Sequence, residues 1–216
     1  MSVLVAKELS SVLGSRLTIG RINIGLLNRI IIDDLMLNDQ SGKELLKVGR
    51  LSAKFEILPL FNGRISIGNV QLFSFNANLE KPTPQATSNF QFVLDAFASK
   101  DTVKKKSNLD LRINSLLIRR GRVSYDVLSA ERTPGKFNPQ HIRLSNILAN
   151  ISLKALQSDS INAAIKRMSI EEDHSGFELK KLSLKIVANN KKMWIENFAI
   201  DLPNTSPVSY THLRAH

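Results

Sequence analysis

Few residues in this sequence have the type and spacing that catalysis or metal binding requires. His174 closes the acidic run "EEDH", and His141 stands alone ahead of an alternating segment. A histidine beside carboxylates can act as a general base or bind a divalent cation. Either role needs partners from elsewhere in the chain. The two other histidines, His212 and His216, lie in residues 207–216, a C-terminal stretch that breaks the patterns of the preceding sequence. We therefore interpret His141 and His174 as structural residues.

Other signatures of chemistry point the same way. Asp33 and Asp34 are adjacent carboxylates, but they occupy a strand-bulge position at which other segments carry Gly-Arg or Lys-Lys. We therefore interpret this pair as filling a strand kink and not as an acid–base dyad. No G-x-S-x-G elbow, P-loop or G-x-G-x-x-G motif occurs. The chain has no cysteine, which excludes disulfides and thiolate ligands. We expect no enzymatic activity, no cofactor and no metal.

Charge restricts the classes of partner. Lysine and arginine total 30 against 19 acidic residues, giving a formal net charge of +11 that favours anionic partners. A nucleic-acid surface would combine basic residues with stacking aromatics, and Tyr125 is the only aromatic close to the arginine cluster. We expect the basic residues to be solvated strand faces near an anionic membrane, with no nucleic-acid partner. They are Lys104 to Lys106, Arg119, Arg120, Arg122, Lys166, Arg167, Lys180, Lys181 and Lys185.

Two segments have helical periodicity. Residues 1–14 predict an amphipathic helix that ends at Gly14, and residues 82–107 predict a loop with a second short helix capped by Ser88 or Asn89. The apolar residues that define these helices at i, i+3, i+4 and i+7 or i+8 spacing are Val5, Leu9, Val12 and Leu13, then Phe90, Val93, Leu94 and Phe97.

A single pattern organises most of the remaining chain. The segment "RISIGNVQLF", residues 64–73, reads apolar-x-apolar-x-x-apolar-x-apolar, so its alternation shifts by one residue at Gly68-Asn69. On a strand, one inserted residue in a β-bulge explains the shift, with two residues facing one on the partner strand. The other inserted pairs are Gly20-Arg21, Asp33-Asp34, Gly49-Arg50, Asn114-Ser115, Ser145-Asn146, Lys166-Arg167, Lys180-Lys181 and Glu196-Asn197.

These patterns predict a mainly β protein with a long, curved, antiparallel-type sheet of bulged strands and two short helices. The expected order is a helix, four strands, a helix and about six strands, including one plain strand at Val123 to Val127. We assign 15–81 and 108–206 to two β segments of one groove. The final stretch "SPVSYTHLRAH" resembles a translated sequencing-adapter read-through, so we interpret residues 207–216 as a non-native tail.

The shared apolar face of about ten strands needs a cover. Its area is on the order of 1,400 Å², whereas two short helices cover roughly 300 Å². The sheet could close on itself as a sandwich or barrel, or stay open as a trough that binds an elongated apolar ligand. The residues alone leave both possibilities open.

A family resemblance bears on this choice. "LSSVLGSRLTIGRINIGLLNRIIIDDLML" and "GRLSAKFEILPLFNGRISIGNVQL" resemble the N-terminal portion of TamB-type proteins, within the AsmA-like group of bridge-like lipid transfer proteins. "LDLRINSLLIRRGRVSYDVL" and "FNPQHIRLSNILANISLKAL" resemble the continuation of that portion. The resemblance extends over nearly all of residues 4–203, but this sequence has neither an N-terminal anchor of about 20 apolar residues nor the family's C-terminal domain.

The resemblance implies a function. Family members are anchored in the inner membrane, cross the periplasm as a grooved β-sheet, and are implicated in phospholipid movement and in outer-membrane protein assembly with a barrel partner. We therefore expect a periplasmic groove segment in which phospholipid acyl chains lie along apolar strand faces. The groove-wall candidates are Ile19, Ile32, Ile65, Ile67, Val70, Ile113, Leu116, Leu144 and Leu184. The alternatives are a closed β scaffold that pairs with client β-proteins and a basic nucleic-acid-binding domain.

Overall fold

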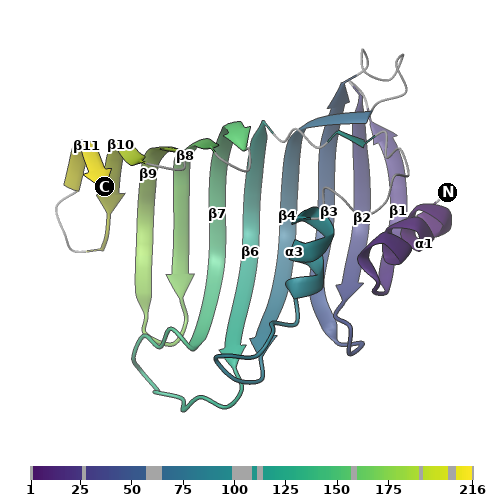
Figure 1. The fold of residues 1–216 in the computed structure, drawn as a ribbon, viewed down its shortest axis with the longest axis horizontal. Helices are drawn as coiled ribbons and strands as arrows, with labels where there is room; N and C mark the ends of the chain where they lie inside the picture. Colours follow the sequence, from purple (N-terminus) through teal and green to yellow (C-terminus); the bar gives the residue numbers. More distant parts are fainter. Residues whose placement is uncertain are drawn as a thin grey trace.

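The computed structural model describes residues 2–25, 28–56, 65–98, 109–110, 114–156, 160–189, 192–203 and 208–215. These residues form one eleven-stranded sheet with two helices (Figure 1). The first part of the chain contains α1 (Ser2–Leu13), β1 (Leu17–Gly25), β2 (Arg29–Asn38), β3 (Glu44–Glu56), β4 (Ile65–Lys81) and α3 (Gln91–Ala98). The second part contains β5 (Leu109–Asp110), β6 (Ser115–Val127), β7 (His141–Leu156), β8 (Ser160–Glu172), β9 (Phe177–Asn189), β10 (Met193–Asp201) and β11 (Val208–Ala215).

The strands follow one another across the sheet almost in sequence order. The path is β1-β2-β3-β4-β6-β7-β8-β9-β10-β11, with the short β5 beside β4. The predicted mainly β class is confirmed, but the sheet is mixed because β4 pairs with β5 and β6 in parallel. The connection between β4 and β6, which contains α3, returns the chain to the end of the sheet where β4 begins. A strand that starts at that end must run parallel to β4.

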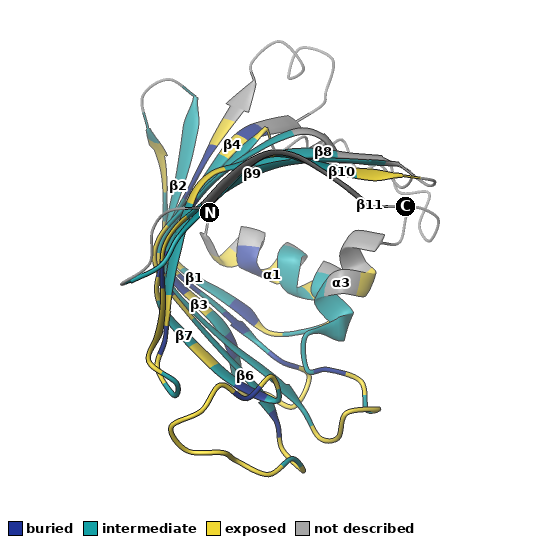
Figure 2. Ribbon diagram, turned by 90° about the vertical axis from the view of Figure 1, so that its left-hand side faces the viewer, coloured by how far each residue is buried: buried dark blue, intermediate teal, exposed yellow. Residues whose placement is uncertain are grey.

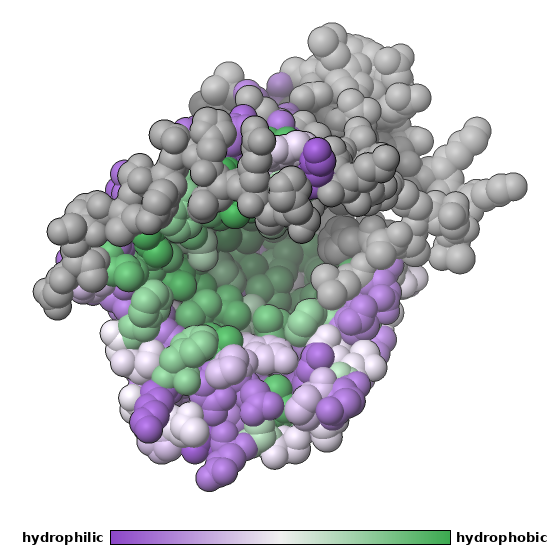
Figure 3. Space-filling view, turned by 60° about the vertical axis from the view of Figure 1, so that its left-hand side comes forward, coloured by the Kyte–Doolittle hydropathy of each residue, from purple (hydrophilic) through white to green (hydrophobic). Residues whose placement is uncertain are grey.

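The sheet is an open trough. Figure 2, seen along the row of strands, shows the strands bending into an arch, with α1 and α3 inside its concave side. Figure 3 shows hydrophobic side chains lining the hollow and hydrophilic ones below its rim. Of the two solutions that the sequence left open, the described residues adopt the open one.

Residues in the left-handed backbone region mark where strands kink. Asp34 in β2, Ser74 in β4 and Arg120 in β6 have φ between 54° and 57°. The kinks of neighbouring strands meet, because a Cβ added to Gly20 would lie 3.0 Å from the Asp34 Cβ. A Cβ on Gly49 would likewise lie 3.3 Å from the Ser74 Cβ. Glycine therefore alternates with a left-handed residue from β1 to β4, since two adjacent side chains would crowd each other.

The inserted residues act in two ways. Between β1 and β6 the inserted residues of adjacent strands stand opposite each other at the level of Asp34 and Ser74, and the pairing continues in register through this level. The predicted two-against-one arrangement is wrong there, because a residue inserted in every strand leaves no unmatched partner. Register shifts occur at Gly68, where β3 and β4 pair, and in all four strand pairs from β6 to β10. These shifts are β-bulges of the expected kind.

Two kinks were not predicted. Ser74 and Arg120 have positive φ in the middle of β4 and β6. Val123 to Val127 pairs regularly with β7, as expected of a plain strand, but it is the last part of β6 and continues through the kink at Arg120 to Ser115. For Ser74 the signal was present, because Val70, Leu72, Phe75 and Ala77 repeat the apolar template immediately after Gly68-Asn69.

The best-packed part of the molecule lies where the helices cover the sheet. Ala6 of α1 packs with Leu17, Leu37 and Leu45, and side chains of α3 and β4 extend this cluster. Gly14 ends α1 with φ +62°. Asn89 does not act as the expected helix cap, because its side chain binds the β4 backbone at Glu80 N and Asn78 O.

The last strand pairs with the edge of the trough. Val208–Ala215 forms β11, antiparallel to β10 along its whole length. An unpaired sheet edge presents free backbone donors and acceptors to any extended segment. Residues 208–215 therefore occupy the β10 edge as an added strand.

Candidate functional site: the concave apolar face

Two continuous rows of apolar side chains cross the concave face. In each row, every residue is the register partner of the next, so all members point to the same side of the sheet. The first row is Ile22, Ile32, Leu51, Leu72, Ile118, Ala149, Met168, Leu182 and Ile200, from β1 to β10. The second is Ile24, Ile30, Ala53, Val70, Leu116, Ile151, Ile165 and Leu184, from β1 to β9.

Six of the predicted groove residues lie in described side-chain positions on this face. Ile32 belongs to the first row, and Val70, Leu116 and Leu184 belong to the second. Val70 and Leu116 are direct register partners across the parallel β4–β6 junction. Ile19 pairs with Leu35, and Leu144 pairs with Val123, on the same side of the sheet.

The side chains of the three other predicted groove residues lie outside the described set. Ile67 pairs with Phe55 and Ile65 with Leu109 in the backbone register, while their side chains lie outside the described set. Ile113 also lies outside the described residues. The prediction omitted members of the rows such as Leu72 and Ile118, which the same alternation would have identified.

Most of the buried apolar residues gather on the strands beside α1: Ala6, Leu17, Leu35, Leu37, Leu45, Val48 and Ala53. The members of the two rows are less buried. Most of them are half-buried from β1 to β10, such as Leu51, Leu72, Leu116 and Leu184, and Ile24 is 73% exposed. The chain exposes 14516 Å² in total, whereas a compact protein of 24.1 kDa exposes about 10,000 Å². The two rows thus form an accessible apolar surface.

One aromatic ring interrupts the regular floor of the trough. Phe75 of β4 lies over Gly121 of β6, and a Cβ on Gly121 would stand 2.7 Å from Cζ of this ring. Gly121 is buried although it has no side chain. The ring therefore fills the space that Gly121 leaves open, as an aromatic residue shields a strand glycine.

The opposite, convex face is polar. Asp33 accepts a hydrogen bond from Arg50 Nε at 2.7 Å, and Arg21 Nη2 lies 3.9 Å from its second oxygen. The hydrogen bond from Arg50 is the main cause that lowers the pKa of Asp33 below its usual value. Asp34 is exposed at the kink, so the adjacent carboxylates do not form an acid–base pair. Both residues serve the geometry of the sheet.

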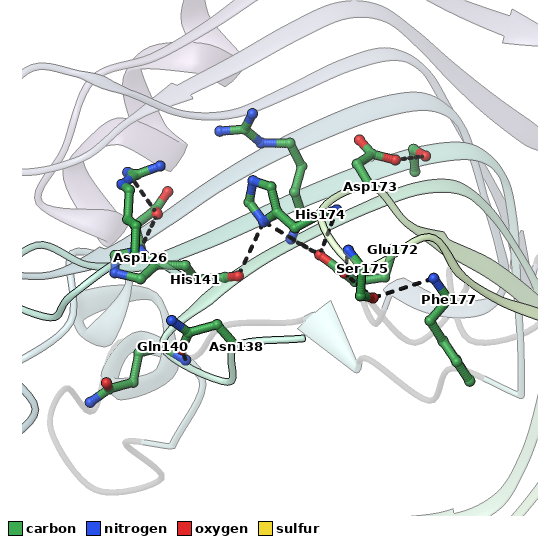
Figure 4. A network of polar contacts seen from close by, with 12 residues as sticks. Asp126, Asn138, Gln140, His141, Glu172, Asp173, His174, Ser175 and Phe177 are labelled. Carbon is green, nitrogen blue, oxygen red and sulfur yellow. Dashed lines mark hydrogen bonds and ion pairs between the residues drawn. The ribbon is translucent and has the colours of Figure 1, made fainter. Parts of the chain in front are cut away.

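The two histidines lie in a polar network at the end of β6, β7 and β8 (Figure 4). His141 is 3% exposed, with Nδ1 at 2.7 Å from Asp126 Oδ1 and Nε2 at 3.0 Å from the Ala130 carbonyl. Both ring nitrogens are therefore engaged. His174 Nδ1 lies 3.3 Å from the carbonyl of His141. This arrangement ties the 128–140 loop to the strand ends.

Glu172 fixes the turn between β8 and β9. Its carboxylate is buried and accepts hydrogen bonds from Ser175 Oγ and Ser175 N and from the backbone of Arg143 and His174. Burial by itself raises the pKa of Glu172, but these donors outweigh it and lower the pKa to about 2. The carboxylate thus remains ionised as a structural acceptor.

No protein-family model matches the sequence, and no curated protein matches it.

Two further features are absent from the described ranges. No group of three or more His, Asp or Glu side chains there could hold a metal ion. No helix among them is long and apolar enough to cross a membrane.

Proposed function

We propose that this chain is a groove segment of a TamB-type lipid carrier, in which phospholipid acyl chains lie along the concave face. The observation that carries the proposal is the pair of unbroken apolar rows, which run across the strands and whose members are mostly only half-buried. An acyl chain along such a row meets apolar side chains on every strand.

The dimensions suit one acyl chain. Five adjacent strands at ~4.8 Å spacing extend over about 20 Å. One leaflet of a bilayer has a hydrocarbon depth of about 15 Å, so an extended acyl chain fits the uncovered part of the trough.

The energetics favour sliding along the groove. Each buried methylene contributes ~0.8 kcal/mol, so ten of them hold a chain by about 8 kcal/mol before entropic losses. Equivalent side chains repeat at every strand, so a shift by one strand exchanges similar contacts. Transfer would be passive, and headgroups would remain in water at the rim.

The cellular setting is part of the same proposal. A groove that holds acyl chains in water suits transfer between two membranes. The resemblance to TamB-type proteins supports a periplasmic setting, with anchoring to the inner membrane by segments outside this sequence and an outer-membrane barrel partner.

Substitution in the groove tests the proposal. Leu116→Asp and Leu144→Asp should abolish co-purification of phospholipid measured by mass spectrometry after solvent extraction, because each places a charge against the acyl chain. Ser124→Asp is the matched control on the convex side of β6 and should keep the lipid. Lipid-free wild-type protein, or equal lipid in all variants, would contradict the proposal.

A crosslinking measurement covers the case in which the aspartate variants unfold. A photo-reactive phenylalanine analogue at Leu116 should crosslink to labelled phospholipid, and the same analogue at Ser124 should not. Equal yields from both positions would show that lipid contacts the surface without using the groove.

A second candidate function is strand addition to client β-proteins. The pairing of β11 with β10 supports it, because this edge accepts an extended segment in register over its whole length. Removing residues 207–216 should then expose the edge and increase binding of a β-hairpin peptide measured by fluorescence anisotropy. No binding by the shortened protein would exclude this function.

A further inference from the structure

The convex side of the trough carries a concentrated group of cations on β6 to β9, which we name the basic band. All eight members are exposed and alternate with the inward apolar residues of the same strands. They are Arg119, Arg120, Arg122, Arg143, Lys166, Arg167, Lys180 and Lys181.

The basic band is not neutralised within the described part of the chain. None of its members forms an ion pair there, whereas Arg50, Lys43 and Lys185 pair with Asp33, Glu80 and Glu196. Two acids at the end of β8, Glu171 and Asp173, are held by the neutral side chains of Asn146 and Ser145. Within the described residues, eight cations without an ion pair thus lie on four adjacent strands.

The inserted residues of the strands place six of the eight cations. Arg119-Arg120, Lys166-Arg167 and Lys180-Lys181 occupy kinks or bulges, and apolar residues that face the groove flank each pair. An insertion bends the strand away from the groove and directs its polar residues outward. The inserted residues that kink the strands therefore also place cations on the convex face.

We propose that the basic band docks the trough on the surface of a bilayer that contains anionic phospholipid. Each lysine or arginine near such a surface contributes attraction, and the effect extends over about a Debye length of 8 Å at physiological salt. Eight cations on four adjacent strands supply enough of these contacts for stable association. This docking uses the face opposite the groove and holds whether or not the groove carries lipid.

Surface chemistry favours a bilayer over other polyanions. Specific protein interfaces rely on several buried aromatic or apolar anchors, whereas the band borders one aromatic ring, Phe73, the register partner of Arg119. Single-stranded nucleic acid needs a series of stacking aromatics, and Phe73 supplies one. A headgroup layer requires only charge, and it adapts laterally to a curved surface.

Vesicle flotation tests the proposal with the full chain. Wild-type protein should float with vesicles of phosphatidylglycerol and phosphatidylcholine, stay unbound to phosphatidylcholine alone, and dissociate as salt rises. Lys180→Gln with Lys181→Gln should weaken binding about 25-fold, since each cation removed costs about fivefold. Lys47→Gln with Lys54→Gln removes the same charge from β3, outside the band, and should cost less than fivefold.

Three results would overturn the proposal. Equal binding to phosphatidylcholine vesicles would assign the attraction to apolar surface, and equal losses in both double variants would assign it to net charge alone. Tighter binding to duplex DNA or polyglutamate than to the anionic vesicles would identify another class of partner. Leu116→Asp separates the two faces, because it should remove groove lipid and leave flotation unchanged.

Discussion

At the residue scale, the contact between Phe75 and Gly121 makes one position of the trough floor intolerant of any side chain. Gly121→Ala should destabilise the protein by about 1–3 kcal/mol, because the new methyl overlaps the ring. Phe75→Leu should relieve the overlap, so a double-mutant cycle by urea unfolding should give a coupling of about 0.5–3 kcal/mol. Additive losses would show that the ring does not fill this space.

Glu172 provides a second test at this scale. Its pKa is lowered from 4.5 to about 2 in the folded protein, so the stabilisation is complete above the unfolded value and is lost as pH falls toward 2. Glu172→Gln should reduce stability by about 2 kcal/mol at pH 7, with the difference from wild type shrinking below pH 4. Urea unfolding between pH 7 and 3 measures this. Glu178→Gln, on an exposed position nearby, should leave the profile unchanged.

At the scale of the strands, the kinks depend on residues that tolerate a left-handed backbone. Asn146 of β7 has φ 49°, and its side chain donates a hydrogen bond to Glu171. Asn146→Gly and Asn146→Val both lose this hydrogen bond. The difference between their free energies of unfolding therefore reports the backbone strain of the left-handed conformation. The valine variant should be about 1–2 kcal/mol less stable by chemical unfolding. Asn150→Val, on the same strand away from the kink, should be tolerated, and similar costs at both positions would contradict the argument.

At the scale of the whole molecule, the helices divide the trough into a covered and an open part. The chain has no cysteine, so single cysteines report accessibility without background. Leu116→Cys and Leu182→Cys should react with a maleimide at least tenfold faster than Val48→Cys, which lies at a position 1% exposed. Uniformly slow labelling would indicate that the sheet closes in solution.

The alternating pattern predicted a great deal of the fold because its physics is local. An inserted residue shifts the side-chain alternation of a strand regardless of its neighbours, so positions such as Asp34 and Asn146 could be identified from the sequence. Ser74 fits the same template, whereas the template is broken at Arg120 because Gly121 occupies the position of an apolar residue. Alternation also predicted that Val70 and Leu116 lie on one face, and the structure pairs these two residues in register.

The sequence by itself determined that the chain forms kinked strands with one apolar side, because alternation and insertion act within each strand. Only the tertiary structure decided that inserted residues face one another from β1 to β6, that β6 runs parallel to β4, and that the trough stays open. These features depend on which strands meet and on where α1 and α3 lie (Figure 2). A pattern of period two is the same for a closed sandwich and an open trough, because it records which side of a strand is apolar and not what covers that side.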